Sequence, residues 1–246
     1  MVQKGNPNQL PVRLHTLPTK SIARFCGNSC SVEVFIKSEN RIANLKPSDP
    51  RFVVKEYWDA KAEGHFKDIE DKFQDMIDRL GLGGPLNHSV LKDDVITQMY
   101  ASWYVRAHSS KPEDVQIQGI HGPSEVFSID EREKLEKSGV VTLDADCKVS
   151  GKQFAWPIMF QTMNRIRKQF AGHEWGLLTS KMGDFLIPDK PPKDLVAMPV
   201  SPNHLLVLDQ INQEIPTISV KHINTRFLNS VNAYYFARKI SACPKL

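Results

Sequence analysis

The sequence predicts an α+β fold, in which a helical middle packs on a small mixed β-sheet formed by N-terminal and C-terminal strands. The middle of the chain carries apolar residues at helical spacing, one strand-like segment precedes it, and short apolar segments separated by Gly, Pro and Asp follow it. A chain of 246 residues, 41% of them hydrophobic, is long enough to bury a sizeable core. We therefore predict a single α+β domain over residues 13–246, preceded by a flexible arm at residues 1–12.

The N-terminal part is predicted to form a short helix and a strand. Residues 18–25 favour a helix, because Pro18 suits the first helical position and Gly27 follows as a stop. Residues 31–38 favour a strand, because valine and isoleucine alternate along them. An extended segment is expected at residues 51–58.

The middle of the chain is predicted to be helical. Apolar residues recur three and four positions apart in three segments, residues 64–80, 92–107 and 157–170. Residues 123–139 are rich in charge and favour a solvated helix. The acidic residues Asp93 and Asp94 suit the first turn of the second helix, because they complement the positive end of the helix dipole.

The C-terminal part is predicted to form short strands and one more helix. The apolar runs WGLLTS, DFLIP, LVAMPV and HLLVLDQ are separated by turn residues, which is typical of a small sheet. A helix is expected at residues 217–230 and a last strand within residues 232–239. We expect the strand at residues 31–38 to pair with these C-terminal strands, which would place the two ends of the chain side by side.

Charge and composition narrow the partners. Residues 1–150 carry a net charge of −2 and residues 151–246 a net charge of +6. This balance is compatible with RNA or DNA as a partner, although a solvated surface is the more common meaning of such a charge surplus. The phosphate-binding residues would be Arg165, Arg167 and Lys168. No apolar run approaches the roughly 18–20 residues of a membrane span, so no membrane partner is expected.

Cofactor and compartment predictions rest on what the sequence omits. It has no phosphate-binding loop and no dinucleotide-binding motif, so no cofactor is predicted. Cys26 and Cys30 have zinc-ligand spacing, but no second pair completes a site, so no metal is predicted. The N-terminus lacks the apolar stretch of a signal peptide, which favours a cytoplasmic protein with free thiols.

One pair of residues has nuclease-like spacing. Arg167 and His173 are separated by five residues, which resembles the R-x4-6-H signature of the HEPN ribonucleases. Chance supplies about one such match in a chain of this composition. Lys168 departs from the small polar residue usual in that family, and His173 lies beyond the expected helix stop at Gly172.

A second resemblance extends along most of the chain. His15-Thr-Leu-Pro18, followed by Ile22 and Phe25, resembles the opening of domain-of-unknown-function family 4238, a bacterial group without an established activity. Further segments resemble its later motifs in the same order: Tyr104-Val105-Arg106, Trp175, the stretch ending Pro188-Asp189-Lys190-Pro191, Met198-Pro199-Val200-Ser201-Pro202, Ile223-Asn224 and Ala233. Pro188 and Val200 depart from its usual Ser and Leu. The resemblance implies a fold outline and candidate positions, not a reaction.

The candidate catalytic residues are His15, Glu70, Arg106 and Asp189. Arg106 shares a helix face with Val95, Met99 and Trp103, so its guanidinium should be buried and need an acidic partner, either Glu70 or Asp189. One interpretation is an internal salt bridge that fixes the helices onto the sheet. The other is a site where Arg106 holds an anionic group and His15, oriented by Asp189, transfers a proton.

Two functions follow from these residues. The first is a soluble nucleic-acid-acting protein, for example a hydrolase of the toxin or phage-conflict kind. The second is a non-enzymatic protein-binding inhibitor or regulator encoded by a phage or mobile element. A pocket that contains His15, Arg106 and Asp189 would favour the enzyme. Dispersal of these residues, or their burial in pairs, together with an exposed apolar patch, would favour the binding protein.

Overall fold

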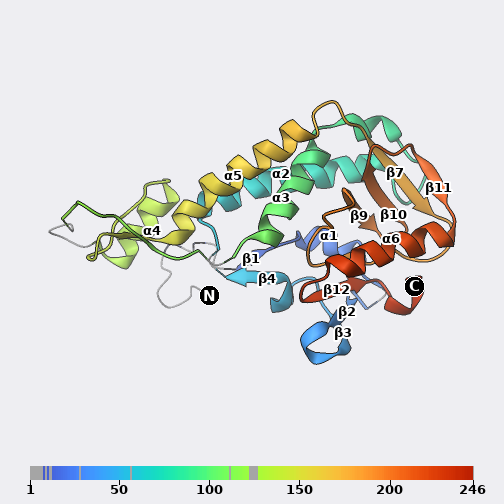
Figure 1. Ribbon diagram of the computed structural model, residues 1–246, viewed down its shortest axis with the longest axis horizontal. Helices are drawn as coiled ribbons and strands as arrows, with labels where there is room; N and C mark the ends of the chain where they lie inside the picture. The colour runs from blue at the N-terminus through green and yellow to red at the C-terminus, as the bar shows by residue number, and fades with distance from the viewer. Residues whose placement is uncertain are drawn as a thin grey trace.

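The structure is a computed structural model that describes residues 8, 10, 13–27, 29–55, 57–110, 112–121 and 127–245. It is an α+β fold, as predicted, with a helical layer beside two small sheets (Figure 1). Of the predicted arm, only Asn8 and Leu10 lie among the described residues. The backbone N–H of Asn8 donates to Glu133 at 2.6 Å, and Leu10 is buried.

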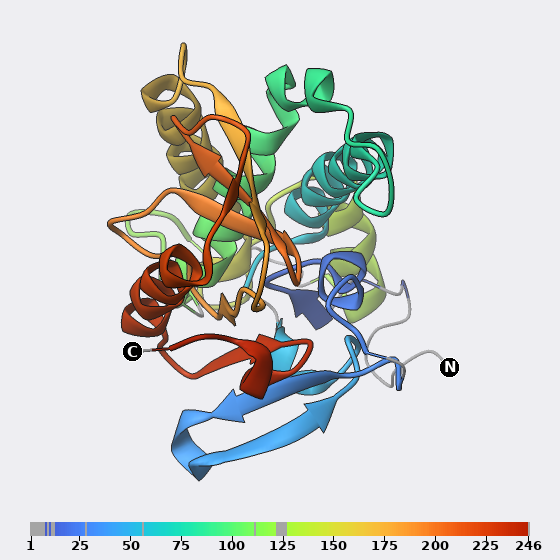
Figure 2. The same ribbon diagram turned by 90° about the vertical axis from the view of Figure 1, so that its right-hand side faces the viewer.

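One sheet joins the two ends of the chain. Strand β2 (Val32–Ile36) pairs with β3 (Arg41–Leu45) on one side and with β12 (Tyr234–Ala237) on the other, and β8 (Ile187–Pro188) completes the order β3-β2-β12-β8. All of these pairs are antiparallel, with Tyr234 opposite Ile36. Figure 2 shows β12 beside the blue β2–β3 hairpin. The predicted pairing of the N-terminal strand with the C-terminal strands is confirmed.

A second sheet is built from the C-terminal part alone. Its order is β11-β7-β10-β9, made of β11 (Gln213–Ile215), β7 (Trp175–Ser180), β10 (His204–Leu208) and β9 (Ala197–Ser201). The β11–β7 pair is parallel and the others are antiparallel, so this sheet is the mixed one. The sequence predicts one sheet, and the structure divides the strands between two. Strands this short cannot run through both layers.

Two smaller pairs complete the strands. Strand β1 (Arg13–His15) pairs with β4 (Val53–Lys55), and β5 (Val115–Gln116) pairs with β6 (Lys148–Val149). The β1–β4 pair carries His15 into the body of the protein, with His15 opposite Val53.

Three long helices form the helical layer: α2 (Ala60–Leu80), α3 (Val95–His108) and α5 (Gly151–Gln169), with α3 packed on both of the others. Asp59 caps α2 by accepting from Ala62 N at 2.9 Å, and Gly81 ends α2 in the left-handed conformation that glycine favours. The shorter helices are α1 (Thr19–Ala23), α4 (Ile129–Lys137), α6 (Thr217–Ser230), η1 (Lys37–Glu39), η2 (Pro50–Phe52), η3 (His88–Lys92) and η4 (Ile240–Ala242). None of the helices in the described part of the chain combines the length and apolar character needed to cross a membrane.

Helix α5 begins earlier than predicted. The sequence places its start at Pro157, and the structure places it at Gly151, so Pro157 lies inside the helix. The early start is stabilised from outside the helix, because the backbone N–H of Gly151 donates to the carboxylate of Asp114 at 3.0 Å. Proline removes one helical hydrogen bond, and the packing of Met159 and Met163 in the core compensates for that loss.

A buried asparagine holds helix α6 to the second, smaller apolar core. Asn224 is fully buried, accepts from Leu186 N at 3.1 Å, and donates to the carbonyl oxygens of Asp184 at 2.9 Å and Pro244 at 3.1 Å. Around it pack Phe185, Phe227 and further apolar residues of β7, β10 and β12. Because both ends of its amide are paired, this polar group is buried without the usual cost.

Two glycines should respond in opposite directions to alanine substitution. Gly64→Ala should stabilise the protein by about 0.5–1 kcal/mol, because Gly64 is exposed within α2 and an added Cβ meets nothing. Gly176→Ala should destabilise it by about 1–3 kcal/mol or more, because a Cβ in β7 would overlap the Gln210 carbonyl. Urea unfolding of both variants checks this. Equal stabilities would contradict the close approach at Gly176.

Candidate functional site

A buried ion pair lies where α2, α3 and β1 meet. The Arg106 side chain is 1% exposed, and its Nη1 lies 2.6 Å from Glu70 Oε1, whose side chain is 22% exposed. The same Nη1 donates to the carbonyl oxygen of His15 at 2.9 Å, and Nε donates to that of Ser102 at 3.3 Å. The guanidinium also lies 4.9 Å from the centre of the Phe66 ring. The sequence leaves Glu70 and Asp189 as possible acidic partners of Arg106, and in the structure the partner is Glu70.

Two more titratable groups share this cluster. Glu63 accepts from Trp58 Nε1 at 2.8 Å, and burial raises the pKa of its carboxyl despite that hydrogen bond and the nearby Arg106. Burial also lowers the pKa of His15, with Arg106 and Arg13 adding to the effect and Glu70 opposing it. His15 is therefore held as a neutral imidazole at pH 7.

The cluster retains unused hydrogen-bonding groups. His15 Nε2 and Arg106 Nη2 are buried and have no partner among the described residues. Each such group carries a desolvation cost of about 1–3 kcal/mol. The His15 ring therefore lies beside the ion pair without being oriented by a carboxylate on its Nε2 atom.

The Asp189 carboxylate contacts backbone N–H groups, whereas the sequence analysis expects it to orient His15. Its carboxylate accepts from the backbone N–H groups of Asn232 at 2.8 Å and Ala233 at 2.7 Å, which fixes the turn between α6 and β12. Its own N–H donates to the Tyr234 carbonyl at 3.1 Å. The structure brings His15, Arg106 and Glu70 together, and it uses the carboxylate of Asp189 elsewhere.

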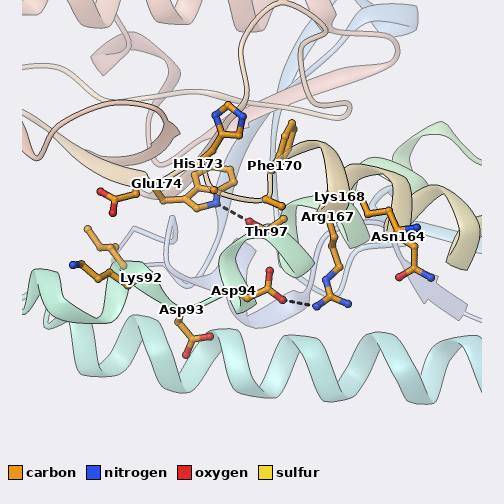
Figure 3. Close-up of a pocket in the computed structure, with 14 residues that line it drawn as sticks. Lys92, Asp93, Asp94, Thr97, Asn164, Arg167, Lys168, Phe170, His173 and Glu174 are labelled. Atoms are coloured by element: carbon orange, nitrogen blue, oxygen red, sulfur yellow. Dashed lines mark hydrogen bonds and ion pairs between the residues drawn. The ribbon is translucent and has the colours of Figure 1, made fainter.

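A pocket of about 600 Å³ opens at the far end of α3. Its walls come from η3, the first turn of α3, the last turns of α5 and the start of β7, and Figure 3 shows their side chains around it. The charged residues that line it are Lys92, Asp93, Asp94, Arg167, Lys168, His173 and Glu174. Arg167 and His173, the pair with nuclease-like spacing, therefore lie at one site.

Two of these side chains, Arg167 and His173, are already paired with carboxylates. Arg167 Nη2 lies 2.7 Å from Asp94 Oδ2, an interaction drawn in Figure 3, and His173 Nδ1 lies 2.7 Å from Asp209 Oδ2. Within the described ranges, Lys92 and Lys168 have no ion-pair partner. The two lysines are therefore the groups of this pocket most ready to meet an added anion.

A buried hydrogen bond joins two of the elements that line the pocket. Trp175 is buried, and its Nε1 donates to Thr97 Oγ1 at 2.9 Å, which joins the start of β7 to the first turn of α3. Phe170 lines the same pocket and is partly exposed, and its ring centre lies 5.9 Å from that of Tyr100. An aromatic ring next to free lysines is an arrangement that suits a nucleobase and its phosphate.

The predicted phosphate-binding residues divide between two places. Arg167 and Lys168 line the pocket, and Arg165 is exposed on α5 without lining it. Sequence reasoning missed Lys92 and Asp209. Neither carries a signal in the sequence, because Lys92 lies in η3 and Asp209 follows β10, and both segments are distant in sequence from Arg167, Lys168 and His173.

Comparisons of this chain with protein families, with curated proteins and with solved structures find no match. The resemblance to domain-of-unknown-function family 4238 stays a prediction.

Arg106→Ala should destabilise the fold by about 3–5 kcal/mol, because it leaves Glu70 without its buried partner. Arg226→Ala is the matched control, since Arg226 and Asp194 are paired at 2.8 Å with both side chains exposed. That variant should lose about 0–1 kcal/mol. Urea unfolding curves give both values, and equal losses would show that the buried pair has no special weight.

The contribution of the neutral His15 side chain to the free energy of unfolding should decrease as the pH is lowered. A lowered pKa in the folded state means that the unfolded chain binds the proton more readily, so this contribution is present above pH 6.5 and is lost as pH falls below it. We therefore compare the free energies of unfolding of wild type and His15→Gln. The value for wild type minus the value for the variant should decrease as the pH is lowered from about 7.5 to about 5.5. A difference that grows over this range would mean that the imidazole is protonated in the folded protein.

Proposed function

We propose that this protein binds nucleic acid through the pocket lined by Lys92, Arg167, Lys168 and His173. The observation that carries the proposal is the convergence of these basic residues, three of them from the basic last third of the chain, on one pocket of about 600 Å³. Two of the acidic side chains in the pocket, Asp93 and Asp94, have cationic partners in Arg79 and Arg167.

The two free lysines would contact phosphate groups. Lysine binds phosphate as a mobile point charge, and neutralising a phosphate releases its counterions. Arg167 is already held by Asp94, so its guanidinium is positioned at the pocket wall and contributes directed N–H donors. Phe170 would stack on an unpaired base, which favours a single strand over a duplex.

The same pocket has a group able to transfer a proton. His173 is exposed to the pocket and is oriented by Asp209 at 2.7 Å. A histidine oriented by a carboxylate is the arrangement that general acid–base catalysis uses. In cleavage of RNA through its own 2′-hydroxyl, His173 would take the proton of that hydroxyl and return it to the 5′-oxygen as the bond from phosphorus to that oxygen breaks. Lys92 and Lys168, the lysines without an ion-pair partner among the described residues, would supply positive charge for the phosphate. Cleavage of RNA by this transesterification, which leaves a 2′,3′-cyclic phosphate, is therefore the finer form of the proposal.

The buried cluster does not support an enzyme made of His15, Arg106 and Asp189. Arg106 is buried against Glu70, and the Asp189 carboxylate is occupied by two backbone N–H groups. By the criterion set out above, burial in pairs favours a structural role for these residues. Catalysis by His15 remains a hypothesis without a supporting contact to Asp189.

A second candidate function is binding of another protein. Large apolar side chains are exposed along residues 115–160, on segments that extend from the body at the end opposite the second sheet (Figure 1). They are Val115, Ile120, Phe127, Ile129, Val140, Val141, Phe154, Ile158 and Phe160. Large apolar side chains exposed on one part of a protein are a feature of interaction surfaces where they are contiguous. This observation favours the alternative of a protein-binding inhibitor or regulator.

Binding to a single-stranded RNA or DNA probe should weaken as salt rises from about 50 mM to about 200 mM, because each lysine–phosphate contact releases counterions. Changing Lys92 and Lys168 together to Ala should weaken binding. It should also reduce the slope of the logarithm of the binding constant against the logarithm of salt concentration by about 1–2, since each lost phosphate contact lowers that slope by about one. Filter binding measures both, and gels of the same samples report cleavage. His173→Ala should still bind the RNA probe, because Lys92 and Lys168 are unchanged, and should fail to cleave it.

The matched control replaces Lys55 and Lys239, two exposed lysines that do not line the pocket, with Ala. This control should bind as wild type does. Binding that is lost equally in both double variants would place the interaction on general charge rather than in the pocket. Absence of binding to any probe at low salt would remove nucleic acid as the partner and leave the protein-binding function.

A further inference from the structure

Strand β3 is an open edge of the sheet that joins the two ends of the chain. It pairs with β2 on one side, and no strand in the described part of the chain lies on its other side. The β2–β3 hairpin projects from the body with β3 outermost, as Figure 1 and Figure 2 show. Proteins commonly protect such an edge with a proline, a lysine or a bulge. The sequence of β3, RIANL, has no proline or lysine, and its pairing with β2 runs over the whole strand without a bulge.

The register of the sheet shows which backbone groups of β3 point toward β2. The N–H of Lys37, just after β2, donates to the Ala233 carbonyl at 3.0 Å, so Lys37 faces the β12 side. Successive residues of a strand direct their backbone groups to opposite edges, so Val34 faces β3. Val34 is opposite Ala43, the central residue of β3. Ala43 therefore directs its N–H and C=O to β2.

Ile42 and Asn44, on either side of Ala43, direct their N–H and C=O groups away from β2. No backbone hydrogen bond to another described segment occupies these four groups. The Ile42 side chain is 50% exposed and lies opposite Phe35, whose ring stacks on that of Tyr235 at 5.2 Å. The edge thus offers two donors and two acceptors beside the exposed end of an apolar row.

A second copy of β3 that runs antiparallel fits this edge. Pairing about a two-fold axis at Ala43 places Ile42 of each copy opposite Asn44 of the other, so all of the outward groups gain partners in four hydrogen bonds. The two Ala43 residues then form the central pair without hydrogen bonds between them. In such a pair the Cα atoms approach to about 4.5 Å, and the methyl group of alanine leaves room for that approach.

The side chains of β3 also suit this pairing. Arg41 is the only charged residue of the strand, and it would lie opposite Leu45 of the second copy, so no like charges face each other. Arg41 is already paired with Glu39 of its own chain at 2.5 Å. The Ile42 side chains of both copies would lie on one face of the joined sheet. The strand therefore meets the requirements of pairing with itself at each position, which favours a second copy over a peptide of unrelated sequence.

We propose that two copies of this protein form a two-fold dimer through antiparallel pairing of their β3 strands. The two four-stranded sheets would join into one sheet with the order β8-β12-β2-β3-β3-β2-β12-β8. No residue of β3 lines the pocket proposed to bind nucleic acid. The dimer and the proposed function are therefore independent, and either can fail without the other.

Sedimentation equilibrium from micromolar to millimolar protein tests the dimer, in a reducing buffer so that the exposed Cys30 does not link two copies. Wild type should shift from monomer to dimer as its concentration rises. Asn44→Pro should weaken the dimer by about 10-fold or more, because it removes two of the four intermolecular hydrogen bonds. The pairing of β3 with β2 is spared, since the Asn44 N–H faces outward. Asn44→Ala, the matched control, keeps this N–H and should dimerise as wild type does.

Amide hydrogen exchange tests the same edge on wild type. The N–H groups of Ile42 and Asn44 should exchange more slowly as protein concentration rises, because the dimer protects them. The Glu214 amide, on the edge strand β11, is the reference. The N–H of Lys181 donates to the Ile215 carbonyl at 3.2 Å, so Ile215 faces β7 and Glu214 faces outward. Exchange of the Glu214 amide should not depend on concentration.

Three outcomes overturn the proposal. The first is a wild-type protein that stays monomeric over the whole concentration range. The second is a dimer whose Ile42 and Asn44 amides exchange at a rate independent of concentration, which would place the contact on another surface. The third is a folded Asn44→Pro protein that dimerises as tightly as wild type. Because exchange is measured on wild type, misfolding of a variant does not decide the result.

Discussion

The Arg106–Glu70 pair is the constraint on which the rest of the structure depends. One guanidinium, almost completely removed from water, contacts a carboxylate of α2, the Ser102 carbonyl one turn earlier in its own helix, and the backbone of β1. Removing a charge from water is expensive unless its partners are in place. The ion pair therefore ties α3 to α2, and β1 cannot shift along α3 without breaking the hydrogen bond from Arg106 Nη1 to the His15 carbonyl.

Helix α3 connects this pair to the pocket proposed to bind nucleic acid. Arg106 fixes its last turn, and Thr97 fixes its first turn through the hydrogen bond to Trp175. Asp94, just before the helix, holds Arg167 at the pocket wall. A helix secured at both ends keeps the groups at its N-terminus in constant positions, which is what binding by a few charged side chains requires. The stability of the core and the shape of the pocket are thus linked through one 14-residue helix.

Periodicity in the sequence is sufficient for much of this fold and insufficient for its sites. The stripe of Val95, Met99 and Trp103 correctly places Arg106 in the core, because helical geometry links positions three and four apart. It cannot choose between Glu70 and Asp189, since that choice depends on tertiary packing. The start of α5 is missed because Asp114, far away in sequence, holds Gly151. The cross-strand pairing of Ser201 in β9 with His204 in β10 could have been predicted, because a two-residue turn between two predicted strands places its flanking residues opposite each other. Lys92 and Asp209 had no comparable signal.

The position of β12 has a consequence for how the chain is made. This strand lies inside its sheet, between β2 and β8, although it follows β2 in the sequence only after all of the helices α2 to α6. While the ribosome is still adding residues 234–237, β2 and β3 can form only a hairpin with an open edge, and isolated hairpins are marginal in water. The sheet must therefore close after most of the chain has emerged, through contacts of very long sequence separation, which slows folding. Until β12 has been made, the edge of β2 that β12 covers in the folded protein is open to pairing with another strand.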